Sequence, residues 1–274
     1  MFRLEKTHLL AAGLAIGTAS AATASYVIVD DFESYALGRV SDGSLVFTNN
    51  GGGPWTGWDG SGPVGSGLIA ITDDNGNQYL DHGWTTADSG IRGAYRAVTP
   101  IADTDAATYY FQVRSADPTP NASYGLSSIA VPTNSFDAFD VEIALVDDDS
   151  ATNDEFKVIA KNGGNNVDLA TGLSINNWYD VWVVVDNATN TYDVYFGTTG
   201  DANILGTKVG EDLAFRNGAV GDLITFATLS QQHGNRQAHV DNIQFNSVAV
   251  PEPSSLALLS LGSLLIARRR RGSA

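Results

Sequence analysis

A two-residue repeat of apolar side chains constrains the fold of this 274-residue chain more than any other feature. It is clearest in Trp178-Tyr-Asp-Val-Trp-Val-Val-Val-Asp186, which the turn Asn187-Ala-Thr-Asn190 joins to Thr191-Tyr-Asp-Val-Tyr-Phe196. Successive side chains of a strand point to opposite faces, so this pattern predicts a hairpin with one apolar face. We expect that face to carry Val181, Val183, Val185, Tyr192, Val194 and Phe196. Asp180, Trp182, Asp193 and Tyr195 should take the other face.

The same alternation recurs from 26–32 to 239–245, and no helical stripe interrupts it outside the two ends of the chain. Between residues 25 and 250 the acidic residues are 25 Asp and only 4 Glu. Asp favours turns, together with Gly and Asn, whereas Glu favours helices. About 225 residues suffice for one sizeable β domain. The sequence therefore predicts a loop-rich, all-β domain over residues 25–248.

Three segments make this domain resemble a known fold. The hairpin above is one, and the others are the opening Val29-Asp-Asp-Phe-Glu33 and the closing His239-Val-Asp-Asn-Ile-Gln-Phe245. Together they resemble the laminin-G-like and concanavalin A-like domains across roughly residues 26–247. The resemblance implies a two-sheet antiparallel jelly-roll sandwich in which the first and last strands pair.

The first 24 residues have the pattern of a secretory signal peptide. Arg3 and Lys6 form a basic region, and residues 9–19 form an apolar stretch that we expect to be helical. Ala22-Thr23-Ala24 is a small-residue cleavage pattern that makes Ser25 the first mature residue; cleavage after Ala21 is the alternative.

The last residues, 249–274, have the pattern of a membrane-sorting tail. Pro251-Glu252-Pro253 precedes an apolar segment, 254–267, and then the basic residues Arg268, Arg269, Arg270 and Arg271. Fourteen helical residues reach about 21 Å, short of the roughly 30 Å hydrocarbon core of a bilayer. On length alone the segment could be a buried core helix. The arginines argue against this, because burying them unpaired is prohibitive, whereas they can reach a cytoplasmic headgroup layer.

This order of parts resembles the PEP-CTERM sorting signal of Gram-negative bacteria. The resemblance implies a short transmembrane helix that is recognised and removed by an exosortase. Signal peptidase and exosortase are then partners during export, anchoring at the inner membrane is transient, and the final place is the cell surface or the extracellular matrix. A permanent, unprocessed C-terminal anchor is the alternative.

Removing both ends reveals a strongly acidic body. The ends take away six basic and two acidic residues, so residues 25–250 keep 9 basic and 29 acidic residues. Such a surface repels nucleic acid and anionic lipid and attracts divalent cations. Cysteine is absent, which excludes disulfides, zinc-thiolate sites and a thiol nucleophile.

Calcium is the cofactor that the acidic residues suggest, because Ca²⁺ prefers hard oxygen ligands. If the terminal strands pair, Asp31 or Glu33 approaches Asp241, and related carbohydrate-binding sandwiches hold a structural ion in a similar place. The loop 73–77 is a second candidate, although its spacing differs from that of an EF-hand. The alternative is that these residues are turn formers and solvated charges.

Aromatic side chains suggest a polysaccharide ligand. Trp55, Trp58 and Trp84 lie in glycine-flanked, loop-like sequence where an indole can stack on a sugar ring. Trp182 and Tyr195 would form a platform on the sheet face opposite the core. Rings of this size also serve as core residues, so a structural role is the alternative.

No catalytic constellation is apparent, so we predict that the domain is not an enzyme. None of His82, His233 and His239 belongs to a recognisable triad or metal motif. The alternative is a glycoside hydrolase or lyase, which needs two facing carboxyl groups. Asp137, Asp140 and Glu142 come nearest, but their spacing differs from the Glu-x-Asp-x-x-Glu pattern of laminarinase-type enzymes.

Overall fold

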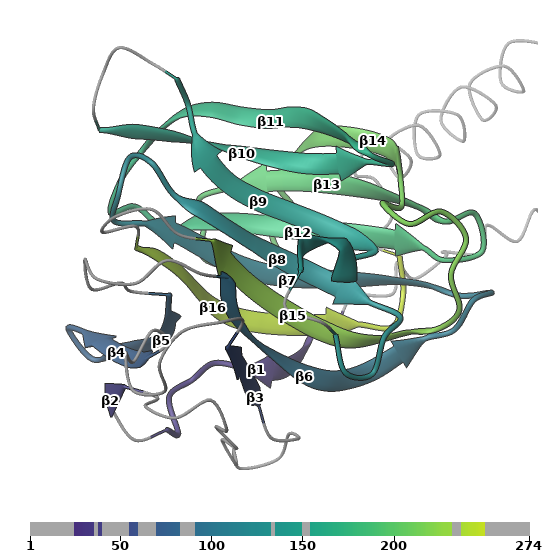
Figure 1. Ribbon diagram of the computed structural model, residues 1–274, viewed down its shortest axis with the longest axis horizontal. Helices are drawn as coiled ribbons and strands as arrows, with labels where there is room; N and C mark the ends of the chain where they lie inside the picture. Colours follow the sequence, from purple (N-terminus) through teal and green to yellow (C-terminus); the bar gives the residue numbers. More distant parts are fainter. Residues whose placement is uncertain are drawn as a thin grey trace, which may run out of the picture.

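The structure is a computed structural model that describes residues 25–35, 38–39, 55–59, 70–82, 91–132, 135–149, 154–231 and 237–249. These residues form two stacked antiparallel sheets and one short 3-10 helix, η1 (Phe136–Ala138) (Figure 1). The predicted all-β antiparallel jelly-roll sandwich is confirmed. The two helices that the sequence predicts at its ends lie outside the described residues.

The first sheet has nine strands. In spatial order it runs β14 (Thr207–Ala214), β13 (Thr191–Gly197), β12 (Tyr179–Asp186), β7 (Ala106–Ser115), β16 (Ala238–Asn246), β5 (Asn77–Asp81), β4 (Ala70–Asp74) and β2 (Gly38–Arg39). The ninth strand, β1 (Val27–Asp30), pairs with the C-terminal half of β16, whereas β5 pairs with its N-terminal half.

The second sheet has seven strands and packs against the first. Its spatial order is β11 (Asn165–Ser174), β10 (Glu155–Asn162), β9 (Val141–Asp147), β8 (Asn121–Ser127), β15 (Leu223–Gln231), β6 (Ile91–Ile101) and β3 (Thr56–Asp59).

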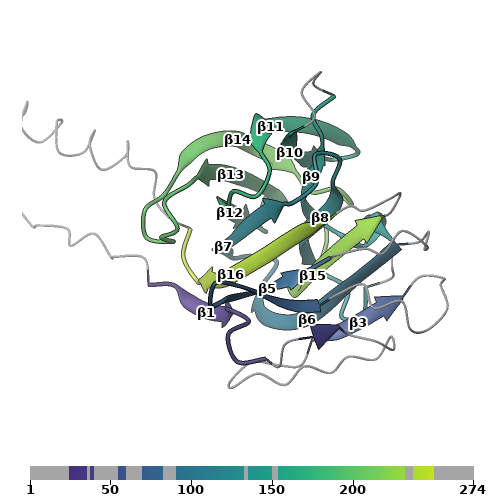
Figure 2. The same ribbon diagram turned by 90° about the vertical axis from the view of Figure 1, so that its left-hand side faces the viewer.

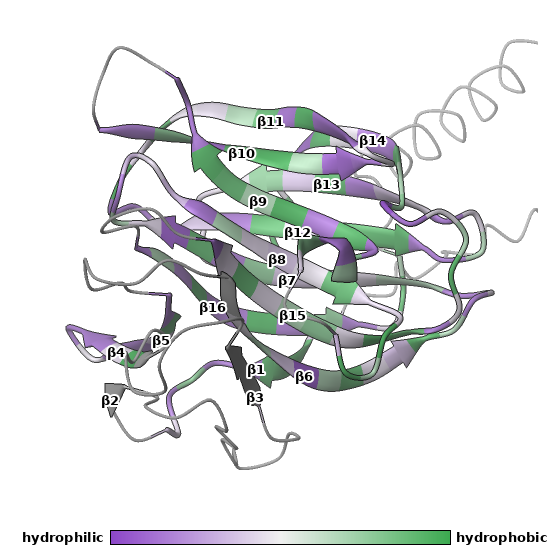
Figure 3. Cartoon of the chain, viewed as in Figure 1, coloured by the Kyte–Doolittle hydropathy of each residue, from purple (hydrophilic) through white to green (hydrophobic). Residues whose placement is uncertain are grey.

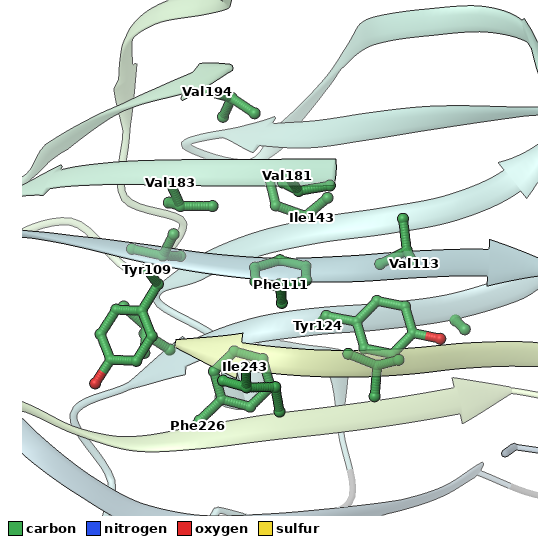
Figure 4. Packing of buried hydrophobic residues seen from close by; sticks show 14 of the residues in the cluster. Tyr109, Phe111, Val113, Tyr124, Ile143, Val181, Val183, Val194, Phe226 and Ile243 are labelled. Carbon is green, nitrogen blue, oxygen red and sulfur yellow. The ribbon is translucent and has the colours of Figure 1, made fainter. Parts of the chain in front are cut away.

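The main core lies between the two sheets. Hydrophobic and hydrophilic residues alternate along the long strands, as Figure 3 shows, so each sheet offers one apolar face. Figure 4 shows the contact: Phe111 and Val183 from the first sheet face Ile143 and Phe226 from the second. These four side chains are at most 2% exposed. Burial of this area is the main favourable contribution to folding.

The two terminal strands of the domain are neighbours, as predicted. β1 pairs antiparallel with β16, with Val27 opposite Phe245. The chain therefore enters and leaves the sandwich at the same end, where β1 lies beside the end of β16 in Figure 2. We call this the tail end of the sandwich.

Candidate functional site

The β12–β13 hairpin carries different chemistry on its two faces, and its register is the predicted one. Val183 lies opposite Val194 and points into the main core, together with Val181 and Val185. Trp182 lies opposite Tyr195 and points to the outer face of the nine-stranded sheet, where both rings pack with Tyr110.

The outer face is covered at Trp182, so the predicted aromatic platform is wrong. The loop 198–206 folds back over the sheet and is held there by Asp180, whose Oδ2 accepts a hydrogen bond of 2.8 Å from the backbone N–H of Gly200. The indole Nε1 of Trp182 donates to the carbonyl of Ala202 at 2.9 Å. Trp182 is 0% exposed and Tyr195 is 4% exposed. Neither ring offers an open face for stacking on a sugar.

A cavity of about 440 Å³ lies beside this covered region, on β12, β13 and the tail end of the domain. We call it the β12–β13 cavity. Val184, Tyr195 and Ala106 contribute apolar lining, and Thr189 and Thr191 contribute hydroxyl groups. Ala249, which lies two residues before Pro251, also lines it. Tyr195 therefore lines this cavity although its ring is mostly covered.

Carboxylates supply the charge of the β12–β13 cavity. Asp186, Asp193 and Asp212 line it. Lys208 offsets one of them, with its Nζ 2.9 Å from Asp193 Oδ2 and 5.6 Å from the centre of the Tyr195 ring. The other oxygen of Asp193 accepts a hydrogen bond of 2.8 Å from the backbone N–H of Asp212. The described residues around the cavity thus leave it with a net negative charge.

Trp55 is part of the core, so its prediction as a sugar-stacking residue is wrong. It is 0% exposed and packs against Phe32 and Phe226. Its Nε1 donates to Asp30 Oδ2 at 2.7 Å, and Arg96 pairs with the same oxygen at 2.5 Å. A buried charge must be paired, and here the indole and the Tyr35 hydroxyl both donate to the Asp30 carboxylate beside Arg96. Its local sequence, rich in glycine, gives no sign of this distant partner.

The other two loop tryptophans stay predictions. Trp58 lies in β3, where its backbone pairs with Gly93 of β6, at the end of the sandwich opposite the tail end. Trp84 lies outside the described residues.

A cation–aromatic cluster that the sequence did not predict occupies the outer face at that opposite end. The guanidinium of Arg114 lies 4.6 Å from the centre of the Tyr79 ring and 4.7 Å from that of Trp178. Its Nε donates to Nδ1 of His239 at 3.0 Å, and its Nη1 pairs with Asp74 at 2.8 Å. Because β4, β5, β7, β16 and the residue before β12 contribute these side chains, only the strand order brings them together.

The predicted calcium ligands lie close together, and each already accepts hydrogen bonds from the protein. Asn77 donates to Asp241 Oδ2 at 2.9 Å, while the next residue, Gln78, donates its backbone N–H to Glu33 at 2.9 Å. Burial, with smaller contributions from the charges of Glu33 and Asp31, raises the pKa of Asp241 to about 7. Within the described ranges no three acidic or histidine side chains converge closely enough to hold a metal ion.

The carboxylates nearest to a hydrolase pattern are held in structural contacts. Arg216 pairs with both Glu142 and Asp137 at 2.5 Å. Asp140 accepts hydrogen bonds from the side chain of Asn217 and the backbone N–H of Ser128. The Glu142 and Asp137 carboxylates are thus held by one shared guanidinium and do not stand as a free pair facing each other.

Residues 249–271 match the PEP-CTERM protein-sorting motif. The tail predicted from the sequence is therefore confirmed as a PEP-CTERM sorting motif. It indicates export and membrane-anchored sorting. No helix among the described residues has the length and apolar character needed to cross a bilayer.

Solved structures with a similar fold have little sequence in common with this chain. A sialidase has a TM-score of 0.47 and 11% identity over 76% of this chain, which spans 19% of the sialidase. The VIP36 exoplasmic/lumenal domain, in a form bound to Ca²⁺ and Man3GlcNAc, has a TM-score of 0.47 and 9% identity over 81% of this chain and 94% of its own. Peanut lectin has a TM-score of 0.47 and 11% identity over 78% of this chain and 98% of its own. No curated protein sequence matches the chain.

Proposed function

We propose that this protein is exported, moored briefly in the inner membrane by its tail and released by exosortase to the cell surface or extracellular matrix. There its β-sandwich binds carbohydrate without catalysing a reaction. The observation that carries the proposal is the sorting motif at residues 249–271. The paired terminal strands support it, because a chain that leaves beside its own entry point can be tethered and released without disturbing the core.

Carbohydrate binding is the finer part of the proposal. It is supported by the β12–β13 cavity, whose volume of about 440 Å³ falls in the range of small-molecule sites. Trp58 and Trp84 stay candidate stacking residues of the same proposal and are not among the residues that line the cavity. A structural Ca²⁺ near Asp31, Glu33 and Asp241 belongs to the same proposal as a stabilising ion with no part in chemistry.

A glycoside hydrolase is the second candidate, and the contacts of Asp137, Asp140 and Glu142 disfavour it. Glycoside hydrolysis requires a pair of carboxyl groups that face a cleft. Prolonged incubation with polysaccharides that the protein retains should release no reducing ends. Release that disappears in the Glu142→Gln variant would instead establish the hydrolase.

The sorting half is tested by following the chain in cells that carry exosortase. We expect the wild-type chain to lose its tail and to leave the membrane fraction. Replacement of Pro251, Glu252 and Pro253 by alanine should keep the full-length chain in that fraction, because the extended recognition segment is lost. Ser273→Ala, beyond the matched residues, is the control. Release of the triple variant at the wild-type rate would contradict exosortase sorting.

A further inference from the structure

The β12–β13 cavity has a chemistry that selects among saccharides. Its floor is apolar at Val184 and Ala106, and its polar rim combines the Thr189 and Thr191 hydroxyl groups with carboxylates. The two hydroxyl groups lie 2.8 Å apart and hydrogen-bond to each other. An apolar floor with hydroxyl and carboxylate groups around it fits a ring that has one apolar face and a polar edge.

The three carboxylates differ in how many of their oxygens already accept a hydrogen bond or an ion pair within the protein. Asp193 has both oxygens occupied, one by Lys208 and the other by the backbone N–H of Asp212. Asp186 uses Oδ1 to cap its own turn, accepting from the backbone N–H groups of Ala188 and Thr189. The Asp212 side chain is exposed at the rim. Asp186 and Asp212 are therefore the carboxylates that can meet a ligand.

The charge of the cavity decides which ligand is favoured. Three carboxylates line it and one ammonium, that of Lys208, lies beside it. An acidic sugar would be repelled, both here and by a body with 29 acidic and 9 basic residues. A protonated amine on a sugar ring would instead form charge-assisted hydrogen bonds with Asp186 or Asp212.

From these observations we propose that the β12–β13 cavity binds an amine-bearing saccharide, such as a glucosamine unit of a polysaccharide. The inference rests on the proposed carbohydrate-binding function and names its ligand class and its site. Val184 and Ala106 lie under the sugar ring, Thr189 and Thr191 contact its hydroxyl groups, and Asp212 pairs with its ammonium group.

The test compares three probes by calorimetry on the full-length chain in mild detergent: the tetrasaccharides of glucosamine, N-acetylglucosamine and galacturonic acid. We expect the glucosamine probe to bind about tenfold more tightly than its acetylated form, because acetylation removes the charge. The acidic probe should not bind. Added salt should weaken the glucosamine complex, since an exposed ion pair is screened.

Two variants should change glucosamine affinity in opposite directions. Asp212→Asn should weaken binding about fivefold, and its left-handed backbone (φ 49°) accepts asparagine, so the fold is kept. Lys208→Met should tighten binding about twofold, because it removes the opposing cation. Asp103→Asn, at the same end of the sandwich but outside the cavity lining, is the charge-matched control and should leave affinity unchanged.

The outcomes separate this inference from the proposed function. Equal binding of the amine and acetylated probes, or indifference to both variants, would overturn the amine-bearing ligand and leave carbohydrate binding in place. Failure of all three probes, together with no retention on a broad glycan array, would defeat carbohydrate binding itself.

Discussion

At the scale of single residues, the local sequence predicts which side chains are large and apolar but not which distant groups they meet. Trp55 lies next to glycines in the sequence, yet its indole hydrogen-bonds to Asp30 beneath Arg96. Asp241 shows the same dependence on partners. Asp241 is 1% exposed, and the charges of Glu33 and Asp31 lie near it, so its ionised form is destabilised.

The raised pKa of Asp241 predicts a pH-dependent stability. An unfolded Asp loses its proton near pH 3.8, whereas the folded one keeps it to about pH 7. The protonated Asp241 carboxyl therefore contributes to the free energy of unfolding in full below pH 3.8. This contribution is lost as pH rises to about 7, and it stays lost above that. Asp241→Asn should gain about 4 kcal/mol over wild type at pH 8 and nothing at pH 3.5. Urea unfolding at both pH values measures the difference.

His82 acts in the opposite direction. Burial lowers its pKa to about 4, so its contribution to stability is lost as pH falls from 6.5 towards 4. Comparison of Asp241→Asn with wild type at each pH cancels the effect of His82, because both chains carry it. A stability difference that is the same at pH 3.5 and pH 8 would contradict the assignment to Asp241.

At the scale of elements, the close approach of β8 and β9 depends on one glycine. A Cβ atom at Gly125 would overlap the carbonyl oxygen of Val141 on the neighbouring strand. Backbone atoms cannot move aside without changing the sheet, so Gly125→Ala should destabilise the domain by about 2–3 kcal/mol. Thermal and urea unfolding of the purified variant give the value.

Gly164 provides the matched control for this substitution. It lies in the turn between β10 and β11, and a Cβ there meets nothing within 4 Å. Gly164→Ala should therefore change stability by less than about 1 kcal/mol. Equal losses from the two substitutions would show that close packing of β8 on β9 is not what requires glycine at position 125.

At the scale of the whole molecule, net charge sets how the domain responds to ions. With 29 acidic and 9 basic residues between positions 25 and 250, self-repulsion opposes the compact state and salt relieves it. A structural Ca²⁺ bound near Asp241 should stabilise the domain by more than this screening alone. We expect calcium to raise the melting temperature by several degrees above NaCl of the same ionic strength, and a chelator to reverse the gain.

The control for calcium is the Asp241→Asn variant, which lacks one of the predicted ligands. It should respond to calcium and to NaCl alike. If wild type also shows no difference between the two salts, the calcium prediction fails and screening of the acidic surface accounts for the whole effect.

The sequence by itself determined the fold class, the hairpin register from Trp178 to Phe196 and the pairing of the terminal strands. These are properties of strand periodicity, turn chemistry and recognisable segments, which are local. It also determined the sorting motif, because a motif of this kind is defined by the order of its residues.

Only the tertiary structure decided which aromatic side chains are accessible. Trp182 lies on the predicted face of its strand but is covered by the loop 198–206. Arg114 contacts Tyr79, Trp178 and His239, which come from separate parts of the chain. The β12–β13 cavity likewise depends on residues as far apart as Ala106 and Ala249. Alternation fixes the direction in which a side chain points, whereas its exposure depends on which distant segment packs over it.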